Sequence, residues 1–200
     1  CGGLALPVSA FAAIARRRSP MQFAVVSDTH LGYQDQTSAA QRWQDTVTEL
    51  ARLPAEFVLH LGDVVDGGRE AQYAIYREIR DRLGKPIHEI PGNHDPADLF
   101  ARHIRRQIDI VVEHGWLTFI MLNNSRTDSH DGFLSGNQIQ WIEQQCRIAA
   151  ENDRCVIICM HVPVHENHHP DRGWHVKPDD GQTSFYEITQ KYRDRILALF

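Results

Sequence analysis

Residues 87–95 read Ile-His-Glu-Ile-Pro-Gly-Asn-His-Asp: an apolar segment enters a Pro-Gly turn, and an amide, an imidazole and a carboxylate follow. The apolar segment predicts a β-strand that ends at the turn. Asn93 offers a neutral oxygen ligand and His94 a proton donor or ligand, whereas Asp95 is expected on the surface as a cap of the next helix. Taken alone, the stretch is as typical of an ordinary polar turn as of a functional site.

Two other predicted strands end in the same manner. Residues 25–30 (Val-Val-Ser-Asp-Thr-His) and 58–63 (Val-Leu-His-Leu-Gly-Asp) each carry an apolar run into an aspartate, and a fourth run, 154–160, ends at His161. In open α/β sheets, ligands bind outside the carboxyl ends of the strands. Carboxylate, imidazole and amide groups at several such ends therefore predict one site for hard metal ions.

Alternating strands and helices extend this pattern. We expect strands at 22–27, 57–61, 87–90 and 154–160, a hairpin from 108–113 to 116–122, and helices at 38–53, 69–83, 96–106, 135–152 and 184–200. Ser38, Ser135 and Ser184 are the expected N-caps of three of these helices. The order predicts a parallel sheet with helices on both faces and an antiparallel portion, and the histidine-rich loop 162–183 is long enough to indicate a functional role.

Composition narrows the class of protein. Two hundred residues suffice for one domain with a sizeable core, and the net charge of −5 argues against a surface that coats nucleic acid. Four cysteines without a C-x-x-C pair make a disulfide framework unexpected and leave the redox compartment undecided. Since no segment reaches the roughly 20 apolar residues that a membrane span needs, no transmembrane segment is expected.

The first 20 residues differ from the rest. Residues 1–13 are small and apolar, contain Ala-Phe-Ala at 10–12 and do not begin with Met. They predict that residues 1–20 are the remnant of an export signal, or a linker, before a domain at 21–200. A disordered or docked tail and a lipoprotein that starts at Cys1 are the alternatives. The signal interpretation predicts a periplasmic or exported protein, and otherwise the protein would be cytoplasmic.

Four ordered blocks resemble the calcineurin-like metallophosphoesterases. The blocks are Asp28-x-His30, Gly62-Asp63-x-x-Asp66, Gly92-Asn93-His94-Asp95 and His161. The resemblance covers residues 23–200 and implies the family's α/β fold, an α/β/β/α sandwich of mixed sheets, here without its C-terminal strands. Aspartate at position 66, where purple acid phosphatases place a tyrosine ligand, and Ser-x-x-Gln-x-x-Trp at 135–141 favour the bacterial phosphodiesterase branch.

The resemblance also implies a dinuclear metal centre. Asp28 and His30 would bind the first ion, Asn93 and His161 the second, and Asp63 would bridge both. His94 would protonate the leaving group or stabilise phosphoryl charge, and Asp66 would hold His94 in the useful tautomer. The two divalent or trivalent ions would be Mn, Fe or Zn, because the ligand set contains no thiolate.

The implied reaction is hydrolysis of a phosphodiester or phosphomonoester by a hydroxide bound to both metals. The substrate would be a small phosphate ester such as a cyclic nucleotide or a glycerophosphodiester, and no nucleic acid. The family's closing Gly-His-x-His block has no counterpart in this sequence. Three alternatives follow. The chain is truncated at both ends and is inactive or nearly so as this piece, or it lacks the block, binds metal poorly and is a non-catalytic scaffold of the same fold. In the third, His165, His168 or His169 of the 162–183 loop supplies the missing ligands.

Overall fold

The computed structural model describes residues 18–200, so the predicted export-signal remnant lies almost entirely outside the described residues. In chain order the elements are β1 (Phe23–Val26), α2 (Gln36–Arg52), β2 (Phe57–His60), α3 (Glu70–Arg80), β3 (Ile87–Glu89), α4 (Ala97–His103), β4 (Ile110–His114), β5 (Leu117–Met121), α5 (Gly136–Glu151), β6 (Cys155–Cys159), the 3₁₀ turn η1 (Pro178–Asp180), α6 (Gln182–Lys191) and β7 (Ile196–Leu199).

The first three strands form a parallel sheet in the order β1-β2-β3. Helices α2 and α3 cover its outer face, because each carries an apolar stripe at helical spacing. Trp43 of α2 stacks on Tyr76 of α3 with ring centroids 5.1 Å apart, and both side chains are buried. Tyr73 of α3 and Phe100 of α4 complete this outer core with Val58 of β2.

The second sheet has the order β4-β5-β6-β7. The hairpin β4-β5 is antiparallel and turns at Gly115, whereas β5, β6 and β7 are parallel. Helices α5 and α6 cover its outer face with Ile142, Cys146, Phe185 and Ile188, all buried.

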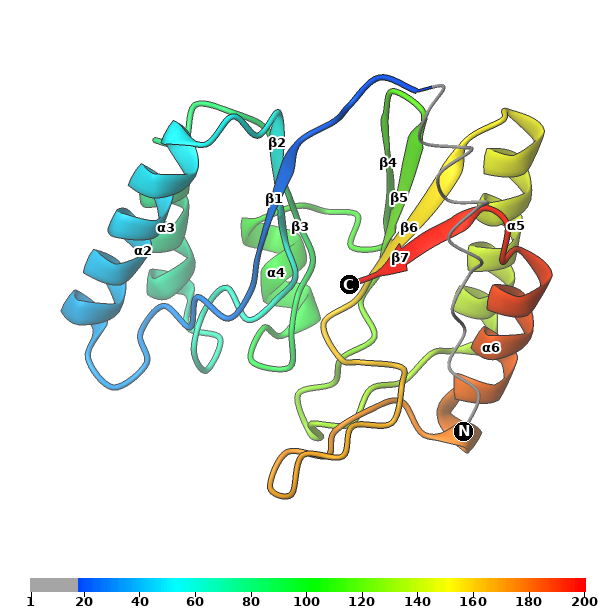
Figure 1. Ribbon diagram of the computed structural model, residues 1–200. Helices are drawn as coiled ribbons and strands as arrows, with labels where there is room; N and C mark the ends of the chain where they lie inside the picture. The colour runs from blue at the N-terminus through cyan, green and yellow to red at the C-terminus, as the bar shows by residue number, and fades with distance from the viewer. Residues whose placement is uncertain (1–17) are drawn as a thin grey trace.

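The inner faces of the two sheets pack against each other. Phe57 of β2 meets Phe119 of β5 edge to face at 5.3 Å, and Leu59 and Cys159 belong to the same buried cluster. Figure 1 shows the resulting order of layers, with α2 and α3 on one side of the paired sheets and α5 and α6 on the other. The predicted α/β/β/α sandwich of mixed sheets is therefore confirmed.

Several details of the predicted elements are wrong. The last helix does not run to residue 200: α6 begins after Gly181, ends at Lys191, and strand β7 follows it. The run Ile-Leu-Ala-Leu at 196–199 fits a helix or a strand by periodicity alone, and the free edge of β6 makes it a strand. Helix α2 is capped by Asp35, whose carboxylate accepts from the backbone N–H groups of Thr37 and Ser38, so Ser38 lies inside the helix. Helix α3 ends at Arg80 rather than at residue 83.

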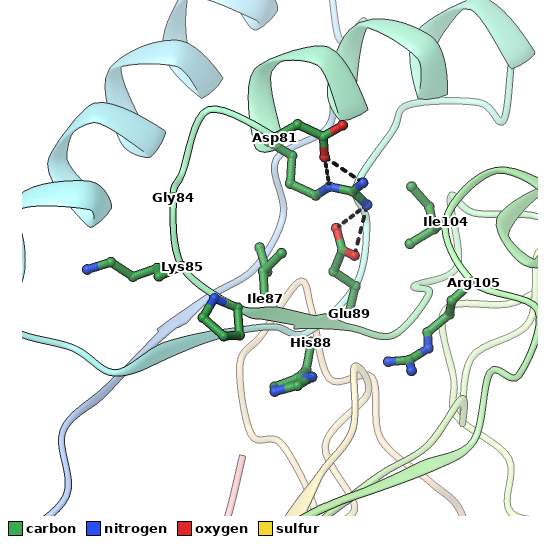
Figure 2. A pocket seen from close by; sticks show the side chains of 10 residues that line it. Asp81, Gly84, Lys85, Ile87, His88, Glu89, Ile104 and Arg105 are labelled. Atoms are coloured by element: carbon green, nitrogen blue, oxygen red, sulfur yellow. Dashed lines mark hydrogen bonds and ion pairs between the residues drawn. The ribbon is translucent and has the colours of Figure 1, made fainter. Parts of the chain in front are cut away.

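A hollow beside β3 is lined by the charged side chains of Arg80, Asp81, Lys85, Glu89 and Arg105, and Arg80 and Glu89 pair with each other. The buried Glu89 carboxylate accepts a hydrogen bond of 2.8 Å from the Tyr76 hydroxyl and pairs with Arg80 at 3.2 Å. The Arg80 guanidinium also donates to Asp81 at 2.7 Å. Figure 2 shows the side chains that line the hollow, Asp81 and Glu89 among them. We assign this arrangement to packing of the sheet edge.

Within residues 18–200, none of the helices combines the length and the apolar character that crossing a membrane requires.

Candidate metal centre

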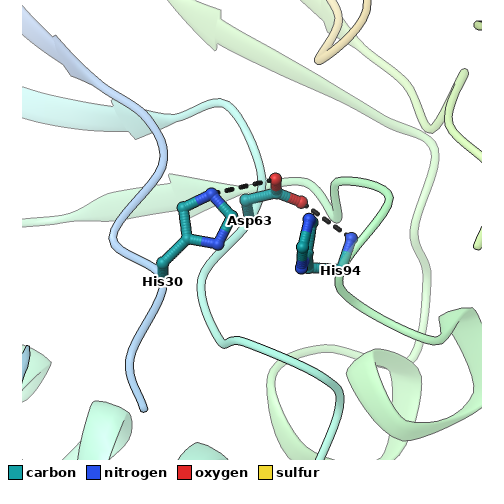
Figure 3. Close-up of side chains that lie close together, drawn as sticks. All are labelled: His30, Asp63 and His94. Carbon is teal, nitrogen blue, oxygen red and sulfur yellow. Dashed lines mark hydrogen bonds and ion pairs between the residues drawn. The ribbon is translucent and has the colours of Figure 1, made fainter. Parts of the chain in front are cut away.

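The loops that leave β1, β2, β3 and β6 meet at one end of the sandwich, and Asp63 lies at their centre. Its side chain is buried, with Oδ2 3.3 Å from His30 Nε2 and 3.4 Å from His161 Nε2. The other carboxylate oxygen, Oδ1, accepts a 2.9 Å hydrogen bond from the backbone N–H of His94. Figure 3 shows this carboxylate between the His30 and His94 side chains. One oxygen of Asp63 is thus within reach of ligands from two different loops.

Two groups of ligand atoms share this carboxylate. One group is His30, Asp63 and His94, the other is Asp28, Asp63 and His161, and within each group the ligand atoms lie within 4.8 Å of one another. Asn93 joins the second group, because its Oδ1 is 3.2 Å from His161 Nε2. The structure therefore brings together every residue that the sequence singled out as a ligand. These groups differ from the predicted assignment of ligands to two ions, because Asp28 lies near His161 as well as 3.6 Å from His30.

Unusual backbone conformations make this convergence achievable. Asp28, His30 and Asp63 have φ values of 58°, 43° and 55°, a region that non-glycine residues rarely adopt. Such conformations cost energy and cluster at functional sites. At Gly62, a Cβ atom would meet His161 Nδ1 at 2.7 Å and the Gly92 backbone nitrogen at 2.8 Å, so the three loops approach too closely for a side chain.

Asp95 links the loop that follows β2 to the loop that follows β3. It is 2% exposed and accepts hydrogen bonds from the backbone N–H groups of Gly92, Val64 and Val65 at 2.9, 3.0 and 3.1 Å. Burial raises the pKa of Asp95 to about 7, against the opposing effect of these three donors. The expectation of a surface helix cap is wrong, because Pro96 is the N-cap of α4 and Asp95 turns inward to the buried amides.

Asp66 lies between two imidazoles. Its Oδ1 is 3.1 Å from His94 Nδ1 and 3.3 Å from His30 Nδ1. The His30 and His94 rings meet edge to face, with centroids 4.6 Å apart. Asp66 is thus placed to orient His94, as the resemblance implies, and it contacts His30 by the same oxygen.

His60 supports the loops from within β2. Its side chain is completely buried, Nδ1 accepts from the Gly62 backbone N–H at 3.3 Å, and Nε2 therefore carries the proton that it donates to Thr29 Oγ1 at 2.7 Å. Burial lowers the pKa of His60 to about 3, so the ring is neutral at pH 7. His60 thus ties the Asp28 loop to the Asp63 loop.

Charge in the cluster is strongly coupled. A hydrogen bond with His30 lowers the pKa of Asp28 to about 2, and the same bond raises the pKa of His30. Burial opposes ionisation of both Asp63 and His161, but their mutual attraction lowers the pKa of Asp63 and raises that of His161. Since a metal ligand must be deprotonated, a cation bound here would displace protons from the imidazoles.

The donor set fits a cation on two observations. First, His161 Nδ1 donates to the Leu61 carbonyl at 2.8 Å, which leaves the lone pair of Nε2 facing the oxygens of Asp63 and Asn93. Three lone pairs that face one another need a positive charge between them. Second, ligands about 2.1 Å from one ion lie about 3.0–3.4 Å apart, close to the observed 3.2–3.4 Å separations around His161 Nε2. Imidazole, carboxylate and amide oxygen together suit Mn, Fe or Zn.

Other histidines divide into those that approach the centre and those that do not. His165 contacts the Tyr186 hydroxyl at 3.0 Å, and His168 lies 4.0 Å from Glu166, so the proposal that the 162–183 loop supplies ligands gains no support. His130, in the loop between β5 and α5, has Nδ1 3.4 Å from Asn93 Nδ2. No sequence signal marks His130, because only the folded chain places its loop beside the third block.

The family model described as calcineurin-like phosphoesterase matches residues 21–193, so the chain belongs to this family. Among curated relatives, it is 28% identical to the probable glycerophosphodiester phosphodiesterase GpdQ of Arcobacter nitrofigilis, over 54% of this chain and 42% of that protein. It is 25% identical to the glycerophosphodiester phosphodiesterase GpdQ of Enterobacter lignolyticus and 27% identical to a 3′,5′-cyclic-nucleotide phosphodiesterase of Nostoc sp., in each case over 72% of this chain and 57% of the relative. The chain spans about half the length of these relatives.

Solved structures show the same fold. A dimetal phosphatase from Danio rerio has a TM-score of 0.73 at 14% identity, covering 90% of this chain and 81% of that one. The purple acid phosphatase PPD1 from yellow lupin has a TM-score of 0.67 at 13% identity, covering 88% of this chain and 36% of that one. At these identities the likeness concerns the sandwich itself. The family membership, in turn, implies a dinuclear metal centre and a phosphoesterase class of hydrolase.

Proposed function

We propose that this chain carries the catalytic centre of a metal-dependent phosphoesterase that hydrolyses a small phosphodiester or phosphomonoester. The observation that carries the proposal is the position of Asp63 Oδ2, 3.3 Å from His30 Nε2 and 3.4 Å from His161 Nε2. A carboxylate in this position can serve two cations at once, and two cations with a shared ligand are a common arrangement for displacement at phosphorus.

In this proposal Asp28 and His30 hold the first ion, Asn93 and His161 the second, and Asp63 both. The ions, Mn, Fe or Zn, would polarise the phosphoryl oxygens and lower the pKa of the attacking water. The protein must keep the ligand imidazoles neutral and aimed inward. The hydrogen bond from His161 Nδ1 to the Leu61 carbonyl aims Nε2 of this ring inward.

His94 is the proposed acid. Its side chain is partly exposed, and Nδ1 lies 3.1 Å from Asp66, which leaves Nε2 to hold the proton for the leaving oxygen or to stabilise phosphoryl charge. The contact with Asp66 fixes the orientation of the His94 ring. The backbone N–H of His94 also donates to Asp63, so acid and bridging carboxylate are held together.

The relatives support a phosphodiester substrate. Their names describe enzymes that act on glycerophosphodiesters and on cyclic nucleotides, and we propose one of these two classes for this protein. Nucleic acid is a poorer candidate, because the net charge of −5 provides no general attraction for a polyanionic strand. A periplasmic or exported location stays a proposal from residues 1–20, which cell fractionation of the tagged protein would test.

The test is hydrolysis of bis(p-nitrophenyl) phosphate and p-nitrophenyl phosphate by the 200-residue chain with Mn²⁺, before and after chelation. We expect turnover that requires Mn²⁺, faster on the diester, and absent from Asp63→Asn. The sequence-based expectation of an inactive piece has no support in the fold or the relatives. A folded chain that binds two Mn²⁺ ions and hydrolyses neither ester would contradict the proposal and favour the non-catalytic scaffold.

A further inference from the structure

Asn93 is held between two imidazoles. Its Oδ1 is 3.2 Å from His161 Nε2, and its Nδ2 is 3.4 Å from His130 Nδ1. The two ends of an amide are not interchangeable, because the oxygen only accepts and the NH₂ group only donates. Only the oxygen can bind a cation, so an amide ligand needs something that decides which end faces the centre.

His130 has the bracing that such a role requires. Its ring stacks on Trp174, with centroids 4.3 Å apart and planes 19° from parallel. The residues that follow His130 and Trp174 are also in contact: the Asp131 carboxylate accepts a hydrogen bond from the His175 backbone N–H at 3.2 Å. The same carboxylate pairs with Lys177 at 3.2 Å. The His130–Trp174 stack is therefore held by the Asp131 contacts as well as by the contact between the two rings.

The same two loops are joined again beside the centre. Asn124 donates to the Val162 carbonyl at 2.7 Å and accepts from the Val162 backbone N–H at 3.0 Å, and both side-chain contacts are buried. Val162 directly follows His161. The loop that carries His130 and the loop that carries His161 thus form one unit on the Asn93 side of the site.

We infer that His130 is a positioning residue whose Nδ1 accepts a hydrogen bond from the Asn93 NH₂ group and thereby holds the amide oxygen toward His161 and Asp63. The inference deepens the proposed function and rests on it. This role requires the neutral His130 tautomer with the proton on Nε2. The stacked Trp174 ring fixes the position of the His130 ring. Without an acceptor at this position, the amide is free to rotate by 180° and to present to the cation a group that cannot bind it.

The test compares four variants by calorimetric titration with Mn²⁺, using the 200-residue chain. His130→Ala is expected to weaken one of the two Mn²⁺ sites by about 10–100-fold, the usual loss when a group that orients a ligand is removed. His130→Asn restores an acceptor near the position of Nδ1 and is expected to bind nearly as the wild type. Trp174→Ala is expected to lie between them. His168→Ala is the control, because this exposed histidine has only a 4.0 Å contact with Glu166.

The outcomes separate this inference from the proposed function. A wild-type chain that binds no Mn²⁺ overturns both. Two Mn²⁺ ions in the wild type and unchanged affinity in His130→Ala overturn the inference alone, as does a His130→Asn variant as weak as His130→Ala. Turnover of bis(p-nitrophenyl) phosphate is the second readout, with a fall in kcat expected for His130→Ala and recovery for His130→Asn. His130→Asn also decides the question if the alanine variant does not fold.

Discussion

Asp63 has three constraints on one side chain: burial, a backbone donor on Oδ1 and two imidazoles near Oδ2. Asp63→Asn keeps the shape and replaces one oxygen by an NH₂ group that cannot bind a cation. We expect the variant to lose both Mn²⁺ ions and all Mn²⁺-dependent turnover, measured by calorimetry and by diester hydrolysis. Retention of one tight Mn²⁺ site would show that Asp63 does not serve both ions.

His94 lies beside the ligands, with a partly exposed side chain that contacts Asp66. Asp66 holds Nδ1, and the ring is open to solvent on one side. His94→Ala should keep both Mn²⁺ ions and lose rate, by about 10²–10⁴-fold if the ring acts as the acid. Calorimetry and kcat on one preparation give the two numbers. Equal losses of Mn²⁺ in His94→Ala and Asp63→Asn would refute the separate roles.

His60 makes the metal-free protein sensitive to acid. Its folded pKa, about 3, lies below the ordinary 6.5, so the unfolded chain binds a proton that the folded chain rejects. This contribution is complete above pH 6.5 and is lost as the pH falls toward 3, by about 2 kcal/mol at pH 5. Urea unfolding at pH 7.5 and pH 5 should show a smaller loss in His60→Gln than in the wild type. Equal losses would contradict the assignment.

Helix N-termini show where local sequence signals suffice. Ser135 and Gln138 form the predicted start of α5 as a capping box, because both halves of that motif are local. Ser184 was predicted to cap the last helix, but α6 begins after Gly181 and Ser184 is exposed within it. Gly181 can adopt φ 103°, which places the helix start three residues earlier.

This contrast gives a paired test of stability. Ser135→Ala should destabilise the fold by about 1 kcal/mol, because it removes the acceptor for the Gln138 backbone N–H. Ser184→Ala should change stability by less than about 0.5 kcal/mol, as exposed substitutions away from caps do. Urea denaturation of both variants measures the difference. Similar losses in the two would mean that the α6 boundary is misplaced.

At the scale of the whole molecule, long-range convergence was predictable where it follows from a rule about strands. The aspartates and histidines after β1, β2 and β3 are expected to meet because these parallel strands end at a common edge. His161 joins them from the second sheet, because the two sheets pack face to face. Strand β7 was missed, since its four apolar residues carry no period that distinguishes a strand from a helix. His130 and Asp95 were assigned to the surface, because their partners are backbone and side-chain groups that only the tertiary fold brings near.

The central claim is that Asp28, His30, Asp63, Asn93 and His161 hold two cations that share the Asp63 carboxylate. Anomalous diffraction from crystals of this chain soaked in Mn²⁺ tests it most directly. We predict two Mn peaks about 3.5–4 Å apart, one on each side of Asp63 Oδ2, with His161 Nε2 and Asn93 Oδ1 against one of them. A single peak away from Asp63, or no peak at this end of the sandwich, would contradict the account.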